Sequence, residues 1–159
     1  MKTFDPLPIW KEPLEYVEWG KSFEPPMANA WLERIGDEIC PIQAIAVCRL
    51  FVPNFVEQDG CMFLEHKFEL DNFRILQAQL DSRAQIENLI NHTHVYDLFR
   101  SNAEFDEQSY IELADLLATM WERALSIAFD DREFEVLATN SDQDYGPIVT
   151  FFTKANETN

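Results

Sequence analysis

The stretch DEQSYIELADLLATMWERALSIAFDDREFEVLATNSDQDYGPIVTFFT, residues 106–153, decides the fold of this chain. Between residues 110 and 129 the polar side chains are few, and they recur at intervals of three and four positions: Glu112, Asp115, Thr119, Glu122, Arg123 and Ser126. This spacing predicts a helix with one narrow polar stripe and an otherwise apolar surface. Such a helix must be buried on several sides, so we expect the rest of the chain to pack around it.

Polar residues mark both ends of this long helix. Either Asp106 or Ser109 fits the N-terminal cap, because the spacing of Ser109 and Glu112 matches a capping box. Asp106 also complements the positive end of the helix dipole. Asp130 and Asp131 follow the last apolar turn, and we expect the helix to end there.

Two strands are expected after the helix. Residues 132–139 alternate apolar and polar side chains, residues 140–146 form an acidic turn, and residues 147–153 are again rich in apolar side chains. Alternation with a period of two is typical of a strand with one buried face. We therefore predict a β-hairpin after the helix and a frayed tail over residues 154–159.

The first 26 residues differ in composition from the rest of the chain. They hold five of the eight prolines, and four large aromatic side chains lie between them: Trp10, Tyr16, Trp19 and Phe23. Proline prevents regular structure, while the aromatic rings need a surface on which to pack. For residues 1–26 we expect an extended arm that lies on the domain, with a short helical turn near residues 14–18. A partner-binding segment with exposed aromatic rings is the alternative.

A bounded helix and two strands are predicted next. Over residues 27–39 apolar side chains recur at three and four positions between two prolines, which predicts an amphipathic helix. The apolar run within residues 43–52 predicts a central strand, and the alternation over residues 61–70 predicts a second one. We expect these strands to form an antiparallel pair, with a turn at Asp59 and Gly60.

The segment after these strands gives a weaker signal. Residues 71–82 fit either a third strand, which we expect, or a helix. The pair Asp81-Ser82 predicts the N-terminal cap of a helix over residues 83–91. We expect His92-Thr93-His94 to interrupt that helix, and a further helical turn over residues 95–99.

Together these patterns predict an α+β fold. We expect a single domain over residues 27–153, in which an antiparallel sheet of about four to five strands packs against the long buried helix and about two or three shorter helices. The chain has 159 residues, of which 47% are hydrophobic, so it can bury a core without disulfides or a structural metal.

The charge is the strongest functional signal in the sequence. Twelve Lys and Arg face 29 Asp and Glu, which leaves a formal net charge of -17. Such a surface repels phosphate backbones and anionic lipids, so we expect no direct binding of nucleic acid or membrane. It attracts a basic protein partner and accelerates the encounter with it. Solubility is the competing explanation, because high net charge also keeps a small protein dispersed.

Acidic residues gather at the predicted turns and helix ends. Carboxylates beside an aromatic ring suit the recognition of Arg and Lys on a partner, such as a nuclease toxin or a nucleic-acid-binding protein. Asp at a turn also has a purely local role, because its side chain bonds to nearby backbone groups. The candidate partner-binding residues are Glu57, Asp59, Glu104, Asp106, Glu107, Asp130, Asp131, Asp142, Asp144 and Tyr145.

Three histidines carry the competing hypothesis, a small-molecule-binding or enzymatic domain. On a helix His92 and His94 point about 200° apart, so they can share a metal ion only in an extended segment. His66 falls on the apolar face of its predicted strand, where a hydrogen-bonded core histidine is common. We therefore expect no metal site and no cofactor. A structural or self-associating subunit is a third alternative.

Local motifs of catalysis are absent from the sequence. The four glycines are isolated, so no phosphate-binding loop can be built, and no G-x-S-x-G elbow is present. Scattered catalytic residues leave no such motif, but we favour a protein that is not an enzyme. The three cysteines form no C-x-x-C pair, and no signal peptide or membrane-spanning run is recognisable. We expect reduced thiols in a cytoplasmic protein.

Overall fold

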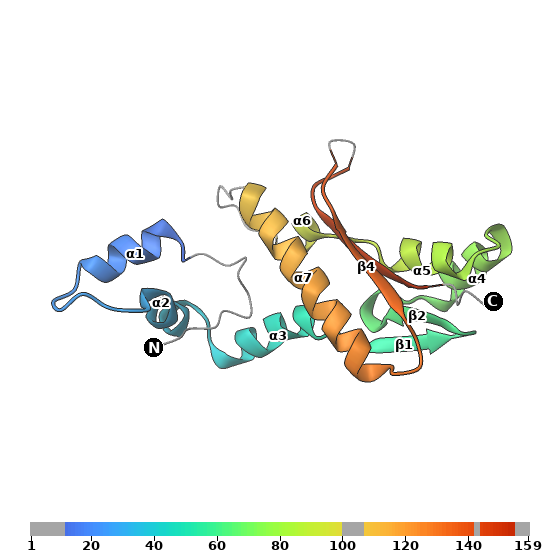
Figure 1. The fold of residues 1–159 in the computed structure, drawn as a ribbon, viewed down its shortest axis with the longest axis horizontal. Coiled ribbons are helices and arrows are strands. Elements are labelled where there is room, and N and C mark those ends of the chain that lie inside the picture. Colours follow the sequence, from blue (N-terminus) through green and yellow to red (C-terminus); the bar gives the residue numbers. More distant parts are fainter. Residues whose placement is uncertain (1–11, 100–106, 142–143, 155–159) are drawn as a thin grey trace. The chain divides into compact units, whose positions relative to one another are not determined.

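The computed structural model describes residues 12–99, 107–141 and 144–154, and Figure 1 shows their helices and strands. The chain divides into two compact units, Met1–Cys48 and Arg49–Asn159. Helices make up the regular structure described in the first unit, whereas the second unit holds both sheets and the long helix. The packing of an N-terminal arm on one domain stays a prediction.

In the first unit, helices α1 (Leu14–Lys21) and α2 (Ala30–Glu38) lie against each other. The guanidinium carbon of Arg34 on α2 is 5.4 Å from the ring centroid of Trp19 on α1, a favourable cation–π distance. The amphipathic helix predicted here is confirmed as α2. The short helical turn predicted within the arm is part of a longer helix, α1.

Helix α3 (Pro41–Phe51) occupies the place of the strand predicted over residues 43–52, so that prediction is wrong. An unbroken apolar run has no period, and it does not distinguish a strand from a helix. The deciding signal is the helix start, because Pro41 fits the first helical position and the Gln43 side chain accepts a hydrogen bond from the Cys40 N–H at 2.9 Å. The helix has no fully buried residue, so it is not central either.

The first sheet is an antiparallel pair of two strands, β1 (Phe55–Gln58) and β2 (Cys61–Leu64). The predicted turn at Asp59 and Gly60 is confirmed, and these residues have φ angles of 52° and 79°. Two successive positive φ angles give the tight turn whose twist matches a hairpin. The strand β2 ends earlier than predicted, because the 3-10 helix η1 (Glu65–Lys67) follows it.

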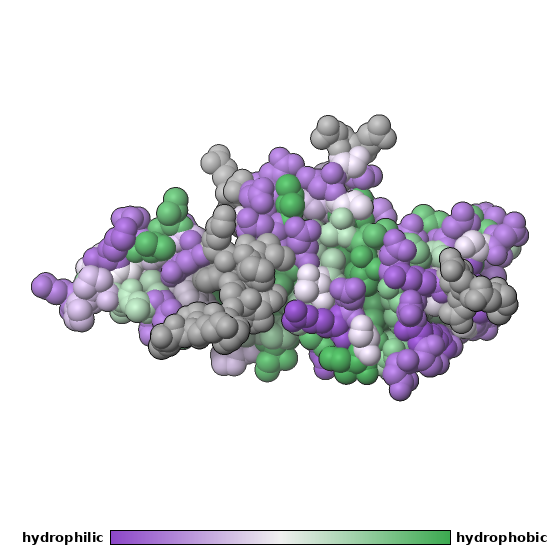
Figure 2. Space-filling model, in the orientation of Figure 1, coloured by the Kyte–Doolittle hydropathy of each residue, from purple (hydrophilic) through white to green (hydrophobic). Residues whose placement is uncertain are grey.

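Helix α4 (Leu70–Gln79) occupies the segment where the sequence favours a third strand, and this prediction is wrong. Phe73 belongs to a hydrophobic cluster with Cys61, Phe63, Ile86 and Ile90, and Leu76 packs against this cluster. A spacing of three residues places Phe73 and Leu76 on one face of a helix. The next predicted helix is confirmed as α5 (Arg83–Asn91), with Ser82 at its N-cap position. The predicted interruption of this helix is also confirmed, because the short strand β3 (Thr93–His94) follows it. The predicted helical turn comes next as the short helix α6 (Val95–Leu98). On the face shown in Figure 2, hydrophilic side chains cover the end where α4 and α5 lie.

The long helix is confirmed as α7 (Glu107–Ala128), which has 22 residues. Ser109 lies inside it and is therefore not its cap, while Asp106 lies outside the described residues. The buried side chains of α7 recur at three and four positions and form one face: Ala114, Leu117, Trp121 and Leu125. The indole Nε1 of Trp121 donates a hydrogen bond to the carbonyl oxygen of Leu50 at 2.7 Å.

The predicted hairpin is confirmed as β4 (Phe134–Thr139) and β5 (Ile148–Thr153), which pair antiparallel in the second sheet. Strand β5 is central, between β4 and the short β3. Helix α7 packs on this sheet (Figure 1), and the main core joins them to β2 and α6. The buried members of this core are Met62, Leu64, Val95, Ala114, Leu117, Trp121, Leu125, Val149 and Phe151.

The fold is α+β as predicted, but the strands form two small sheets instead of one.

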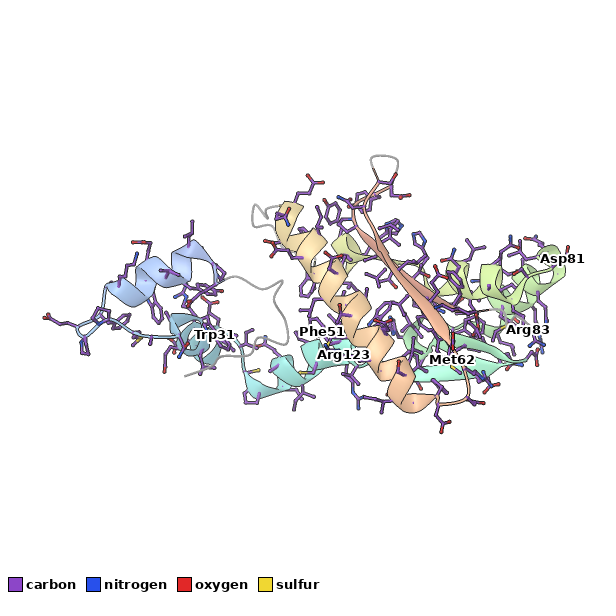
Figure 3. All side chains as sticks on the ribbon, in the orientation of Figure 1. Trp31, Phe51, Met62, Asp81, Arg83 and Arg123 are labelled. Carbon is purple, nitrogen blue, oxygen red and sulfur yellow. The ribbon has the colours of Figure 1, made fainter. Side chains whose placement is uncertain are left out.

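Helix α5 links the two sheets through the fully buried side chains of Glu87 and Asn91, here called the polar clip. The Glu87 carboxylate accepts hydrogen bonds from the N–H groups of Met62 and Thr153, both at 2.6 Å. Asn91 accepts one from the Leu64 N–H at 2.9 Å and donates to carbonyl groups on β2 and β5. Met62 is labelled in Figure 3. Side chains thus satisfy backbone groups that would otherwise need a neighbouring strand.

Candidate functional site

The predicted partner-binding residues separate into two groups. The described ranges exclude three of them: Glu104, Asp106 and Asp142. The tip group lies at the start of α7 and in the loop between β4 and β5: Glu107, Asp144 and Tyr145. The turn group lies on β1, in the turn after it and beyond the end of α7: Glu57, Asp59, Asp130 and Asp131. All seven are exposed. Because a helix rises about 1.5 Å per residue, the two ends of α7, Glu107 and Ala128, are roughly 32 Å apart.

Aromatic contacts hold the tip group together. The ring of Tyr96 on α6 contacts Tyr110 on α7 and Tyr145 in the hairpin loop, with ring centroids 4.6 Å and 5.5 Å away. Gly146 permits this contact, because its φ is +76° and a Cβ at this position would overlap the Tyr96 ring. Desolvation raises the pKa of the Tyr96 phenol, and the nearby charge of Glu107 raises it further. Segments far apart in the sequence therefore meet around one ring.

The tip group is open to solvent, and its carboxylates have no counter-ion among the described residues. Tyr145 is 67% exposed. Within the described ranges, neither Glu107 nor Asp144 forms an ion pair with Lys, Arg or His. The tip thus presents carboxylates next to an exposed aromatic side chain.

Two histidines lie next to the loop that carries Tyr145. The Nδ1 of His94 is 3.0 Å from the carbonyl oxygen of Tyr145, and its Nε2 is 3.2 Å from Nε2 of His92. The two rings meet because residues two apart on an extended segment share a face. Burial lowers the pKa of His92, the neighbouring His94 and Lys67 lower it further, and Asp144 opposes them.

The histidine hypothesis is met only in part. Of its three residues, His92 and His94 are in contact. His66 is exposed within η1, so its predicted position on the apolar face of a strand is wrong. The physical reason is that the chain leaves the extended conformation after Leu64. Among the described residues, no three His, Cys, Asp or Glu side chains are placed to hold a metal ion.

The turn group has an arginine among its carboxylates. The Nη2 of Arg132 lies 2.9 Å from Oε1 of Glu57, and its Nε lies 4.0 Å from Oδ2 of Asp131. The hydrogen bond with Glu57 is the main cause that raises the pKa of Arg132. Carboxylates at this end are therefore partly neutralised by the chain itself, in contrast to those of the tip group.

Sequence reasoning missed several residues that shape these sites. Arg132 follows Asp130 and Asp131 directly, so a local charge pair was readable from the sequence. Tyr96 left no such signal, because its partner Tyr145 reaches it only through the pairing of β3 with β5.

Comparisons with protein-family models, with curated proteins and with solved structures give no match to this chain. In the ranges that the structure describes, no helix has the length and apolar character needed to cross a bilayer. A functional assignment therefore rests on the geometry and charge of the two groups.

Proposed function

We propose that this chain is an acidic, non-enzymatic binding protein of the cytoplasm that neutralises a basic protein partner. The partner class is a nuclease toxin, for which the chain would be an immunity-type protein, or a nucleic-acid-binding protein whose ligand charge it mimics. The observation that carries the proposal is the contact of the Tyr96 ring with Tyr145 in the hairpin loop and with Tyr110 in the first turn of α7. This contact brings the loop that carries Asp144 to the helix start that carries Glu107.

The tip group is the proposed contact surface. A net charge of -17 steers a basic partner toward the chain but does not select where it binds. Carboxylates that pair with no described cation can form charge-assisted hydrogen bonds with Arg or Lys of the partner. The exposed Tyr145 ring offers a face for a guanidinium and an amphipathic anchor for the interface.

A labelled octa-arginine peptide tests this proposal by fluorescence anisotropy at low and at moderate salt. The test variant combines Glu107→Gln with Asp144→Asn. The matched control combines Asp59→Asn with Asp130→Asn, which changes the net charge by the same amount at the other end of α7. We expect the test variant to bind about tenfold more weakly or worse, and the control to bind nearly as the wild type does. Equal weakening by both variants would show that binding follows net charge alone.

A second candidate function is self-association, and the surface of the first unit favours it. Ile42 and Ile45 on α3 are 71% and 61% exposed, and Leu32 on α2 is 56% exposed. Residues 39–56 contain no Asp or Glu, although acidic residues are frequent elsewhere. Because a basic partner gains nothing from a surface without carboxylates, the occupant that fits is a second copy of this chain, which can approach here without repulsion between carboxylates.

Sedimentation of the full chain tests this second function. We expect a dimer for the wild type and a monomer for a variant that combines Ile42→Ser with Ile45→Ser. The matched control, Ile127→Ser, removes an isoleucine that is 86% exposed on α7 and should leave the dimer intact. A monomeric wild type at high concentration would rule out self-association.

A further inference from the structure

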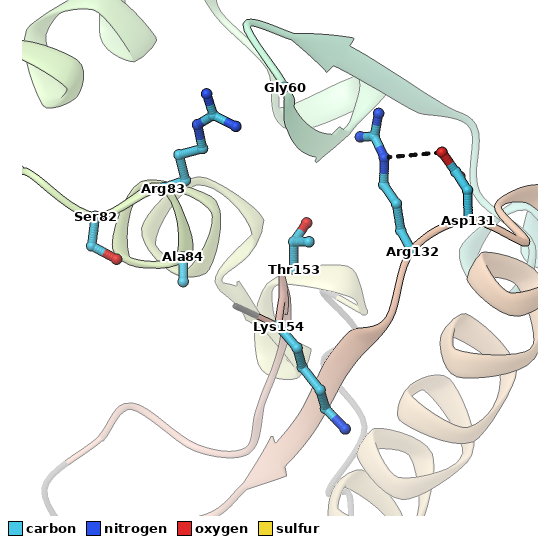
Figure 4. A pocket seen from close by; sticks show the side chains of 8 residues that line it. All are labelled: Gly60, Ser82, Arg83, Ala84, Asp131, Arg132, Thr153 and Lys154. Atoms are coloured by element: carbon cyan, nitrogen blue, oxygen red, sulfur yellow. Dashed lines mark ion pairs between the residues drawn. The ribbon is translucent and has the colours of Figure 1, made fainter. Parts of the chain in front are cut away.

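A cavity of about 530 Å³ lies in the second unit, beside the turn group. Four segments form it: the start of α5, the β1–β2 turn, the link between α7 and β4, and the end of β5. We call it the arginine cavity. Its lining residues are Gly60, Ser82, Arg83, Ala84, Asp131, Arg132, Thr153 and Lys154. Figure 4 shows Arg83 and Arg132 on either side of the cavity, with Gly60 above and Thr153 between them.

The charge of this lining is opposite to that of the whole chain. Three of the chain's twelve Lys and Arg line the cavity, against a single carboxylate, that of Asp131. Within the described residues, Arg83 and Lys154 form no ion pair. Arg132 is held by Glu57 through Nη2, and its other terminal nitrogen, Nη1, is buried with no hydrogen-bond partner among the described residues. Arg83 and Lys154 thus leave positive charge at the cavity that no described ion pair uses.

Buried Glu87 forms no ion pair with the described cations of the cavity. Its carboxylate oxygens accept hydrogen bonds from the Met62 N–H and from both the N–H and the hydroxyl of Thr153. Its lone pairs are therefore directed at Met62 and Thr153. Glu87 adds to the high pKa of Arg132, but only as the smallest contribution, after the hydrogen bond with Glu57.

The backbone adds to this anion-binding character. Helix α5 begins at the cavity, and its first-turn N–H groups have no acceptor within the helix. Ser82 makes no side-chain cap hydrogen bond to them, and the first turn contains no acidic residue. Gly60 lets the Arg83 guanidinium lie against the β1–β2 turn, because an added Cβ would be only 2.9 Å from its Nη1.

We propose that the arginine cavity binds a small molecule that carries a phosphate group. Two guanidinium groups on either side of the cavity and a helix start supply the donors that a phosphate needs, and Lys154 adds positive charge. The volume exceeds that of a phosphate ion and lies in the range of small-molecule sites, so there is room for the organic part of a phosphate monoester. This site is independent of partner binding, which the tip group performs at the other end of α7.

Calorimetric titration of the full chain with phenyl phosphate, inorganic phosphate and phenol tests the proposal at low ionic strength. We expect phenyl phosphate to bind and phenol not to bind. If inorganic phosphate binds as tightly as phenyl phosphate, the cavity recognises the free anion, and if it binds more weakly, the cavity recognises an ester. Either result supports the site, whereas the absence of heat for both phosphates at millimolar concentration would overturn it.

Substitutions locate the binding within the cavity. Arg83→Gln and Lys154→Gln each remove a cation that makes no ion pair within the described chain. We expect each substitution to lower the affinity for phenyl phosphate about tenfold. Asp131→Asn removes the one lining carboxylate and should tighten binding. The matched control is Arg74→Gln, an exposed arginine of α4 outside the cavity, which should leave the affinity unchanged. Equal affinity of the Arg83→Gln variant and the wild type, with both folded by circular dichroism, would also overturn the proposal.

Discussion

The tip group and the turn group contain the same kinds of residue but differ in electrostatic character. Both consist of carboxylates at chain turns, at the two ends of α7. At the turn group, Arg132 neutralises part of the negative charge, and two more cations line the neighbouring cavity. At the tip group the neighbours are aromatic rings and the His92–His94 pair, and no described cation pairs with the carboxylates.

This difference shows what decides the role of an acidic cluster. The carboxylates alone do not separate a solvated turn from a binding surface, because both use Asp and Glu. The neighbours that the fold supplies make the distinction. Cations beside the turn group line the cavity for which we propose an anion, whereas the neighbours of the tip group are aromatic rings, and there we propose a cationic partner.

The largest expected effect concerns the polar clip, which lies next to the turn group. Glu87→Ala leaves the N–H groups of Met62 and Thr153 without acceptors in the interior, so the free energy of unfolding should fall by about 3–5 kcal/mol. Urea unfolding measures this loss. Gln85→Ala, an exposed position on the same helix, is the control and should change little. A loss below about 1 kcal/mol for Glu87→Ala would mean that the clip contributes little to the unit.

The next effect concerns the geometry of the tip group. Gly146→Ala places a Cβ on the Tyr96 ring at a φ of +76°, so we expect a loss of about 1–3 kcal/mol and a displaced Tyr145. Tyrosine fluorescence and urea unfolding report these changes. Gly36→Ala is the opposite case, because a Cβ there meets nothing within 4 Å and alanine favours the helix α2 that contains it. An unchanged tip in the Gly146→Ala variant would contradict the proposed close contact.

A smaller effect is expected on the pH dependence of stability, through His92 beside the tip group. Because the pKa of His92 is lower in the folded protein than in the unfolded chain, protonation favours unfolding. Stability is therefore fully present above about pH 6.5, the ordinary histidine value, and should decline as the pH falls through the lowered pKa. Urea midpoints in neutral and mildly acidic buffer measure this decline. His92→Gln should flatten it, and a slope that persists in this variant would assign the effect to other groups.

The smallest effect is expected from the ion pair of the turn group. The Arg132 and Glu57 side chains are 25% and 47% exposed, so solvent screens their attraction. A double-mutant cycle with Arg132→Gln and Glu57→Gln should give a coupling free energy of about 0.2–1 kcal/mol. A coupling near zero would mean that Glu57 does not neutralise Arg132, and the contrast between the two groups would then be weaker.

The fold was predictable from the sequence where periodicity is strong. A short stretch of sequence is enough to predict three elements: helix α7 from its polar stripe, strands β4 and β5 from their alternation, and the turn at Asp59 and Gly60. Periodicity failed for α3 and for α4. In α3 the apolar run has no period, and the helix is identified instead by Pro41 and Gln43 at its start. In α4 the few apolar residues fit two structures, and packing of Phe73 decides between them.

The site was less predictable, because its character depends on long-range contacts. The sequence identified the carboxylates at the chain turns but did not separate the tip group from the turn group. That separation requires the contact of Tyr96 with Tyr145 and the gathering of Arg83, Arg132 and Lys154 around one cavity. Both depend on how the strands pair, and no local pattern encodes them.

The polar clip has a consequence for aggregation. A sheet edge with unpaired N–H and C=O groups invites a strand from another molecule. Glu87 and Asn91 occupy such groups on β2 and β5 with buried side chains, so an incoming strand would first have to displace a carboxylate and an amide from the interior. A protein with two short sheets thereby resists growth into a longer one.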